Sequence, residues 1–363
     1  SGLVGSEMCI RDRCVPTPER IQRFVAGEHM DTDDLRIRRW GEIGDGYLGP
    51  AFHMRFKPGQ VLYGSRRTYL RKVAVPDFEG ICANTTFVLE SANPEVLLPE
   101  LFPFVMSTEA FHEHSRRESK GSVNPYVNYS DLAWYEFALP PLEQQKKYAR
   151  DLKAASNARN SLESASQALK KALVATRRSL FGVESGMPVD TGRKMTDVVE
   201  FLDHLRVPLS TAVRQEMQGE HPYYGASGVI DHVNDYLFEE SLLLLSEDGA
   251  NLLSRSTPIA FVAEGRYWVN NHAHVLRALH PWTNELLGAY IESISVQRFV
   301  SGTAQPKLTR AACESLPVPL LSEALAVQLS ETEERFRSCE EMLLKRKREV
   351  EAIKNANLAS LSP

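Results

Sequence analysis

Two histidines one residue apart are the first candidates for chemistry. His272 and His274 would lie on the same face of a β-strand, where two imidazoles could hold a metal ion. A third ligand does not follow at the usual spacing, and His112 and His114 would pair poorly on a helix. We therefore expect no metal site, and an enzyme that uses the paired histidines is kept only as an alternative.

The other catalytic signatures are missing or incomplete. Asn124-Pro125-Tyr126 resembles part of the catalytic loop of adenine methyltransferases, but the second proline and a glycine-rich cofactor loop are absent. The sequence also contains no GxxxxGK[ST] phosphate loop and no GxSxG elbow. We therefore expect no catalysis and no cofactor, and we interpret residues 124–126 as a turn or a DNA-facing loop.

Basic and polar loops are better candidates, and the chemistry they suit is contact with nucleic acid. Arg66, Arg67, Arg71 and Lys72 surround Tyr69, and these side chains fit phosphate or guanine, although a solvated basic loop has the same composition. Tyr223 and Tyr224 fit a hydrophobic core equally well. The remaining candidates for DNA contact are Lys120, Ser122, Asn124, Tyr126, Tyr223, Tyr224, Ser227, Asn251, Gln305 and Lys307.

The composition is that of an ordinary globular protein of two to three domains. The 363 residues are 43% hydrophobic and 25% charged, which excludes a disordered or collagen-like chain. With 42 basic and 47 acidic side chains the net charge is −5, yet residues 142–181 carry nine basic and only three acidic ones. A polyanion would thus be held by local patches, although this basic stretch is also typical of a solvated helix face.

Cysteine usage and hydropathy bear on the compartment. The five cysteines are scattered without a CxxC pair, which favours a reducing cytoplasm. The longest apolar run of note, Leu242–Leu245, is far short of the roughly 18 residues that a membrane span needs. Residues 1–13 resemble translated adapter sequence, and we expect residues 1–19 to be a non-native or disordered leader.

Two long polar segments, each preceded by a proline-rich hinge, carry the period of a coiled coil. The first follows residues 139–142 and is expected to end near Phe181, before Gly182. The second follows residues 316–320, and its apolar residues alternate spacings of three and four, which predicts a heptad seam. The predicted seam consists of Leu152, Leu162, Leu169, Leu173, Leu180, Leu325, Leu329, Phe336, Leu343, Val350 and Ile353.

The chain repeats itself. Residues 121–126 lie 181 positions before the similar loop 302–307, and each loop precedes a proline-rich hinge and a long helix. Short apolar runs broken by Gly and Pro precede both loops, which predicts two β-rich α+β modules. Because the two helices match in length, we expect them to pair as an antiparallel coiled coil, with packing of each helix on its own domain as the alternative.

The ordered motifs resemble the DNA-specificity subunit of type I restriction–modification systems from about residue 20 to the end. The matching segments are residues 56–64, 66–72, 139–145, 222–231, 245–252 and 268–276. Family members begin each module with a segment like residues 195–230, of which the first module has only a remnant. We therefore expect its recognition half to be incomplete.

The resemblance implies a non-catalytic subunit that reads a bipartite, asymmetric site in double-stranded DNA. It further implies two modification (adenine methyltransferase) subunits and restriction (translocase–nuclease) subunits as partners, whose methylation and restriction this chain would direct in the cytoplasm. The alternative is a coiled-coil scaffold or interaction protein that does not bind DNA. The expected domains are the leader, a first target-recognition domain (20–138), a first helix (139–182), a second target-recognition domain (183–315) and a second helix (316–363).

Overall fold

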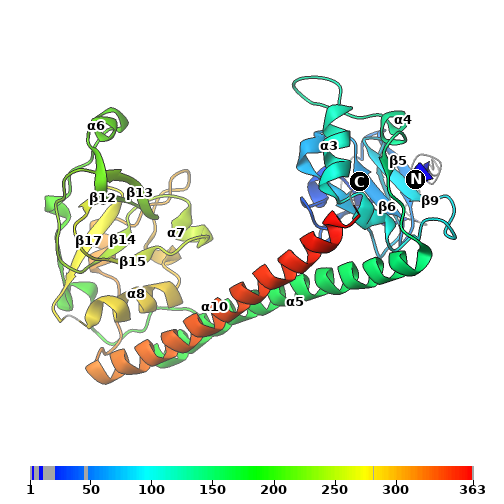
Figure 1. The fold of residues 1–363 in the computed structure, drawn as a ribbon. Helices are drawn as coiled ribbons and strands as arrows, with labels where there is room; N and C mark the ends of the chain where they lie inside the picture. Colours follow the sequence, from blue (N-terminus) through cyan, green and yellow to red (C-terminus); the bar gives the residue numbers. More distant parts are fainter. Residues whose placement is uncertain (1, 4–7, 11–20, 45–47, 281, 362–363) are drawn as a thin grey trace. The chain divides into compact units, whose positions relative to one another are not determined.

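The computed structural model describes residues 2–3, 8–10, 21–44, 48–280 and 282–361. The chain folds as two compact units: the first comprises Ser1–Glu163 with Lys345–Pro363, and the second comprises Ser164–Leu344. Each unit contains two main β-sheets, short helices and one part of each of two long helices (Figure 1).

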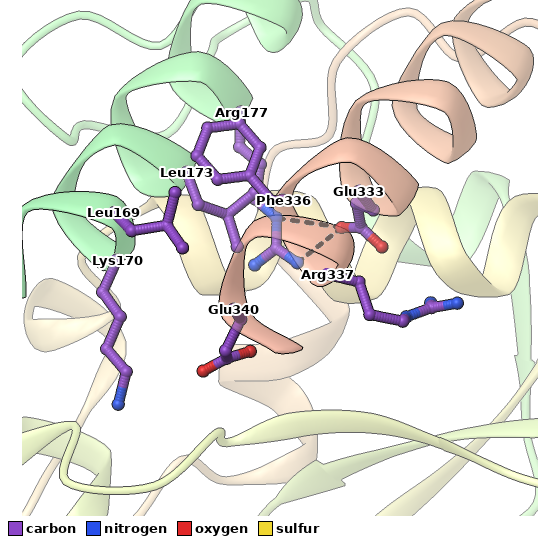
Figure 2. A pocket seen from close by; sticks show the side chains of 8 residues that line it. All are labelled: Leu169, Lys170, Leu173, Arg177, Glu333, Phe336, Arg337 and Glu340. Atoms are coloured by element: carbon purple, nitrogen blue, oxygen red, sulfur yellow. Dashed lines mark hydrogen bonds and ion pairs between the residues drawn. The ribbon is translucent and has the colours of Figure 1, made fainter. Parts of the chain in front are cut away.

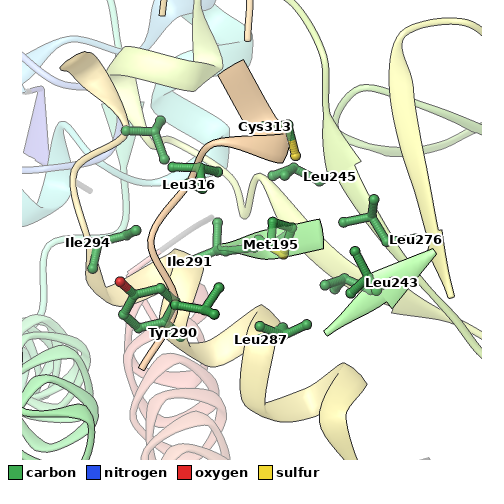
Figure 3. Close-up of a cluster of buried hydrophobic side chains, with 14 of the residues drawn as sticks. Met195, Leu243, Leu245, Leu276, Leu287, Tyr290, Ile291, Ile294, Cys313 and Leu316 are labelled. Carbon is green, nitrogen blue, oxygen red and sulfur yellow. The ribbon is translucent and has the colours of Figure 1, made fainter. Parts of the chain in front are cut away.

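The second unit is built on a four-stranded sheet that is covered on both faces. Its strand order is β11-β17-β14-β15, spanning Val199–Phe201, Ala273–Ala278, Leu242–Ser246 and Ala260–Ala263. Alternate residues of a strand face opposite sides. Leu243 and Leu245 therefore join a core with helix α8, shown in Figure 3, while Leu242 and Leu244 join a core with a second sheet. For this reason every residue of β14 is buried.

That second sheet has the order β13-β12-β16, spanning Gly228–Val233, Gln218–Gly225 and Trp268–Val269. Strands β12 and β13 form an antiparallel hairpin, and β16 runs parallel to β12. Gly228 has a backbone φ of +112°, which residues other than glycine rarely adopt, so the hairpin turn requires glycine there.

The first unit repeats this plan. Its strands β2-β9-β6-β7 span Met8–Ile10, Thr86–Ser91, Val61–Gly64 and Val73–Ala74. Strands β4-β3-β8-β5 span Gly41–Glu42, Arg23–Val25, Gly80–Ala83 and Phe52–Phe56. Val61 and Tyr63 pack with helices α2 and α3, whereas Leu62 packs with the second sheet. The predicted α+β class with two tandem β-rich modules is confirmed.

The first unit contains short strands that correspond to the strands opening the second unit. Strand β3 runs parallel to β8 and antiparallel to β4, as β12 does to β16 and β13. Strand β2 flanks β9 as β11 flanks β17. The first unit thus has counterparts of β11, β12 and β13, and β3 and β4 have three and two residues where β12 and β13 have eight and six.

Part of the predicted leader also differs from expectation. Strand β2 belongs to residues 1–19, and so does β1 (Gly2–Leu3), which pairs with β10 (Glu136–Phe137). The rest of the predicted leader lies outside the described residues.

Short helices complete both units. The α-helices are α2 (Phe102–Val105), α3 (Glu109–Arg117), α4 (Tyr129–Leu132), α6 (Thr211–Glu216), α7 (Asn251–Ser254), α8 (Thr283–Ser293) and α9 (Arg310–Glu314). The 3-10 helices span Gly27–His29, Thr68–Leu70, Met195–Asp197, Asp203–Leu205 and Gln297–Phe299.

The long helices are α5 (Leu142–Phe181) and α10 (Glu323–Ala359), and they run antiparallel in each unit. In the second unit Arg177 forms an ion pair with Glu333, while Leu169, earlier in α5, lines a pocket with Glu340, later in α10. In the first unit Glu163 forms an ion pair with Lys347, while the earlier Asn160 lines a pocket with the later Lys354. Figure 2 shows Leu169, Leu173 and Phe336 beside the Arg177–Glu333 pair.

The seam residues differ in burial along the helices. Leu152 and Leu329 are buried in the cores of the first and second unit, respectively, and Leu180 and Leu325 pack against the core of the second. The other predicted seam residues that are half-buried are Leu162, Leu169, Leu173, Phe336, Leu343 and Val350.

Ile353 departs from the predicted seam, because 55% of it is exposed. The next residue, Lys354, is only 12% exposed at its side chain, and Leu358 and Leu361 pack against the core of the first unit. At this end α10 contacts a globular core, so its buried face follows the 3.6-residue period of a straight helix rather than the heptad.

The Arg177–Glu333 pair provides a test of helix pairing in the second unit. Arg177 Nε lies 3.0 Å from Glu333 Oε1, and the two side chains are 18% and 27% exposed. We expect Arg177→Glu to destabilise the second unit through like charges, and Arg177→Glu/Glu333→Arg to recover part of the loss, with a coupling energy of about 1 kcal/mol. Urea unfolding of the four chains of this double-mutant cycle measures that energy, and a coupling of zero would contradict the pairing.

Candidate nucleic-acid interface

An exposed loop of the first unit brings together several of the predicted residues. Lys120 and Tyr126 pair through two backbone hydrogen bonds of 2.8 and 2.9 Å and close the loop 121–125, which includes the exposed Ser122 and Asn124. The exposed Arg66 lies beside the root of this loop, with its guanidinium 4.8 Å from the centre of the Tyr126 ring. We call this arrangement the first loop.

The second unit holds a copy of the loop at the same place. Ser301 and Lys307 pair through two backbone hydrogen bonds of 2.8 Å and close the loop 302–306, on which Gln305 is exposed. Gly302 has φ +83°, and a Cβ on it would lie 2.5 Å from the carbonyl oxygen of Gln305. This second loop therefore requires glycine at its first residue.

Arg71 and Lys72 are engaged in contacts within the first unit. Arg71 forms ion pairs with Asp33 at 2.9 Å and Glu109 at 2.7 Å, and the Lys72 ammonium donates to the carbonyl oxygen of Gly27. In the second unit Arg255 forms the corresponding ion pair with Glu292. Arg255 lies 184 positions after Arg71, and Glu292 lies 183 positions after Glu109. Because both copies make this contact, Arg71 has a structural role in the first unit, and its contact with DNA stays a prediction.

Lys120 and Tyr69 differ in their availability. Lys120 lies 2.9 Å from Asp131, and the hydrogen bond between them raises the pKa of Lys120 and lowers that of Asp131. Tyr69 is 53% exposed. Of these two residues, Tyr69 is therefore the better placed to contact a ligand.

Two of the second unit's candidates belong to its core. Tyr223 is 1% exposed, its hydroxyl accepts a hydrogen bond of 2.9 Å from the Leu209 amide, and it packs in a small core cluster. Tyr224 packs between the sheets, stacked on Phe261, and burial raises the pKa of its hydroxyl. Tyr223 and Tyr224 therefore pack in the hydrophobic core, the alternative to DNA contact that the sequence left open.

Asn251 also holds the fold, whereas Ser227 stays available. The Asn251 side-chain oxygen accepts from Ser256 and from the Thr257 amide, and its nitrogen donates to the Thr257 carbonyl. Its amide is thus used on both sides to close the loop that follows α7. Ser227 lies exposed in the turn of the β12–β13 hairpin.

The paired histidines serve a buried polar network. His274 is fully buried, with Nδ1 2.7 Å from Asp203 Oδ2 and Nε2 2.8 Å from the Leu308 carbonyl oxygen. Both ring nitrogens are thus engaged with oxygens of the protein, and neither is available to a metal ion. His272 bonds Asp248 at 2.8 Å instead. Among the described residues no group of three or more potential ligands is placed to hold a metal ion.

Sequence reasoning missed the charges beneath the second loop. Glu247 lies 2.7 Å from Arg206 and 3.0 Å from Lys307. Although burial alone would raise the pKa of Glu247, hydrogen bonds from these two cations lower it. The positive charge of Lys307 is therefore balanced by a carboxylate of the same unit. The signal in the sequence was the acidic pair Glu247-Asp248, which stands where the first half has Ser65-Arg66. It becomes visible only when the two halves are aligned.

No described helix has the length and apolar character needed to cross a bilayer.

The chain is similar to known proteins in its second half and in its fold. Residues 191–323 match the family model of the type I restriction modification DNA specificity domain. A putative type I restriction enzyme specificity subunit of Haemophilus influenzae is 30% identical over 128 residues, which cover 35% of this chain and 32% of that protein. The EcoDI specificity subunit of Escherichia coli is 28% identical over 126 residues, 35% of this chain and 27% of that protein. The match thus spans about a third of the curated relatives' length.

Solved structures extend the likeness of fold to nearly the whole chain. One chain, from a structural study of complex assembly and conformational transition of the type I restriction–modification system, has a TM-score of 0.66 at 17% identity, covering 99% of this chain and 96% of that one. The S subunit of such a system from M. genitalium has a TM-score of 0.59 at 14% identity, covering 100% and 95%. The resemblance predicted from the motifs is confirmed.

Proposed function

We propose that this chain is the DNA-recognition subunit of a type I complex, because residues 191–323 match the family model of the type I restriction modification DNA specificity domain. In this proposal each unit reads one half of a bipartite, asymmetric site in double-stranded DNA. The chain directs adenine methylation by two modification subunits and restriction by translocase–nuclease subunits, in the cytoplasm where the chromosome lies. The domain boundaries predicted from the sequence (20–138, 139–182, 183–315 and 316–363) are part of the same proposal.

The observation that carries the proposal is a duplicated fold with unlike surface chemistry. Each unit contains a four-stranded sheet of corresponding strand order, and each places a similarly closed loop at the corresponding position. The side chains on the two loops differ, with Ser122 and Asn124 on one and Thr303 and Gln305 on the other. Two related frameworks with different contact residues suit two different half-sites, since base edges are read by side-chain donors and acceptors.

A map of methylated adenines tests the proposal. The chain is co-expressed with its neighbouring modification subunit in a methylation-deficient host, and the genomic DNA is sequenced for modified adenines. A split asymmetric motif is the expected result. A motif with a single defined half would show that one unit does not read DNA. Failure of the subunits to copurify would overturn the proposal and favour a scaffold that does not bind DNA.

A further inference from the structure

The two loops carry different charges at corresponding backbone positions. In the first unit the Val127 amide donates to the Ser65 carbonyl (3.0 Å) and the Arg67 amide to the Pro125 carbonyl (2.6 Å). In the second, the Leu308 amide donates to Glu247 (2.7 Å) and the Gly249 amide to Pro306 (3.0 Å). The pattern matches residues 65–67 with 247–249. Where the first unit has Arg66-Arg67, the second therefore has Asp248-Gly249.

The cations beside the second loop are used inside the protein. Glu247 forms ion pairs with Arg206 and Lys307, and Asp248 lies 2.8 Å from His272. Arg206 and Lys307 thus each have a carboxylate partner within 3.0 Å. An anionic ligand at this position would meet two carboxylates and compete with them for Lys307.

The first loop presents the opposite situation. Arg66 and Arg67 are exposed, and within the described part of the chain neither has a carboxylate at ion-pair distance. The Tyr126 ring lies against the Arg66 guanidinium, and the bond to Pro125 holds the Arg67 backbone at φ +48°. Lys120 and Arg71 are paired with carboxylates. The charges of these two exposed arginines are therefore not balanced by a carboxylate among the described residues.

We propose that Arg66 and Arg67 form a DNA phosphate site in the first unit, and that the second unit has no such site at the matching position. This inference rests on the proposed function and adds to it a division of labour. A guanidinium presents a fork of donors that fits phosphate oxygens in pairs. The first unit then supplies salt-dependent affinity that is independent of sequence, and the second binds DNA through other, less ionic contacts at this place.

Salt dependence of DNA binding tests the proposal on the full chain in complex with its modification subunits. The dissociation constant for a mixed-sequence duplex is measured over about 50 to 200 mM salt, where each phosphate contact contributes about 0.9 to the slope of log affinity against log salt. We expect Arg66→Gln/Arg67→Asn to reduce the slope by about 1.8. Asparagine suits position 67 because it tolerates a positive φ.

Lys307→Gln is the matched control in the second unit, and it should leave the slope as in the wild type. An unchanged slope in the double variant would overturn the phosphate site, and an equal reduction by Lys307→Gln would overturn the asymmetry. If the double variant instead changes which adenines are methylated, the arginines read bases and the assignment to phosphate fails. A wild-type complex that binds no duplex at any salt would overturn the proposed function as well.

Discussion

Replacing Asp203 with alanine should destabilise the second unit by about 2–6 kcal/mol, because two buried donors lose their acceptor at a cost of about 1–3 kcal/mol each. Asp203 is 6% exposed. Its Oδ2 accepts from His274 Nδ1 at 2.7 Å, and its Oδ1 accepts from the Val275 amide at 2.9 Å. Without the carboxylate, both donors stay buried with no acceptor, between strand β17 and the second loop.

The pH dependence of this loss has a defined sign. Burial alone would raise the pKa of Asp203, but the bond and charge of His274, the Val275 amide and the charge of Arg206 together lower it. A carboxyl group whose pKa is lowered on folding stabilises the fold above its unfolded value of 3.8 and loses that contribution as pH falls through the folded value. The difference in stability between wild type and Asp203→Ala should therefore shrink as the pH falls below about 3.8.

Hydrogen exchange followed by peptide separates the two units. Amides of β14 and β17 should exchange faster in Asp203→Ala, and those of β6 and β9 should keep their wild-type protection. Glu200→Ala is the control, because Glu200 is 55% exposed and pairs with Arg277 at the surface of the same sheet. It should cost less than about 1 kcal/mol. Equal effects of the two substitutions would contradict a buried, stabilising network.

The elements that could be predicted are those that local spacing specifies. The similar loops 181 residues apart and the proline-rich hinges revealed the duplication, and a period of three and four residues revealed the long helices. The prediction was wrong for Ile353 because the partner of that helix turn is a globular core, with Leu358 and Leu361 packed against it. Which surface a helix contacts depends on tertiary packing, and periodicity alone does not contain it.

The candidate site was harder to predict, since exposure and pairing arise between residues far apart in sequence. Tyr223 and Asn251 have the side chains of contact residues, yet Tyr223 fills a core and Asn251 closes a loop. A comparison of the two halves would have helped. Arg71 and Arg255 occupy matching positions and each forms an ion pair with a glutamate, which indicates a structural role. Arg66 and Asp248 also occupy matching positions but differ in charge, which indicates a role in function.

Acidification should destabilise the first unit at a pH where carboxylates are still ionised, because of His112. This side chain is 1% exposed, and neither ring nitrogen has a hydrogen-bond partner in the described part of the protein. Burial, with the positive charges of Arg71 and Arg116, lowers its pKa from 6.5 to about 3. Asp33 lies 3.9 Å away, but it is held closer to Arg71, at 2.9 Å.

The sign follows from which state binds the proton. In the unfolded chain His112 is protonated below pH 6.5, whereas in the folded unit it stays neutral down to about pH 3. Stability is therefore full above pH 6.5 and falls by up to about 1.4 kcal/mol for each pH unit below it. Between pH 6.5 and pH 5 the expected loss is about 2 kcal/mol.

His112→Leu should remove this loss, because leucine fills similar space and does not titrate. At neutral pH the variant should be as stable as the wild type or more so, since two buried nitrogens without partners are also removed. Urea unfolding at several pH values, with hydrogen exchange of β6 and β9 as the reporter for the first unit, measures both effects. His53→Leu, at a more exposed position in the same unit, should retain the wild-type pH profile. If His112→Leu kept that profile too, another group would be responsible for the acid sensitivity of the first unit.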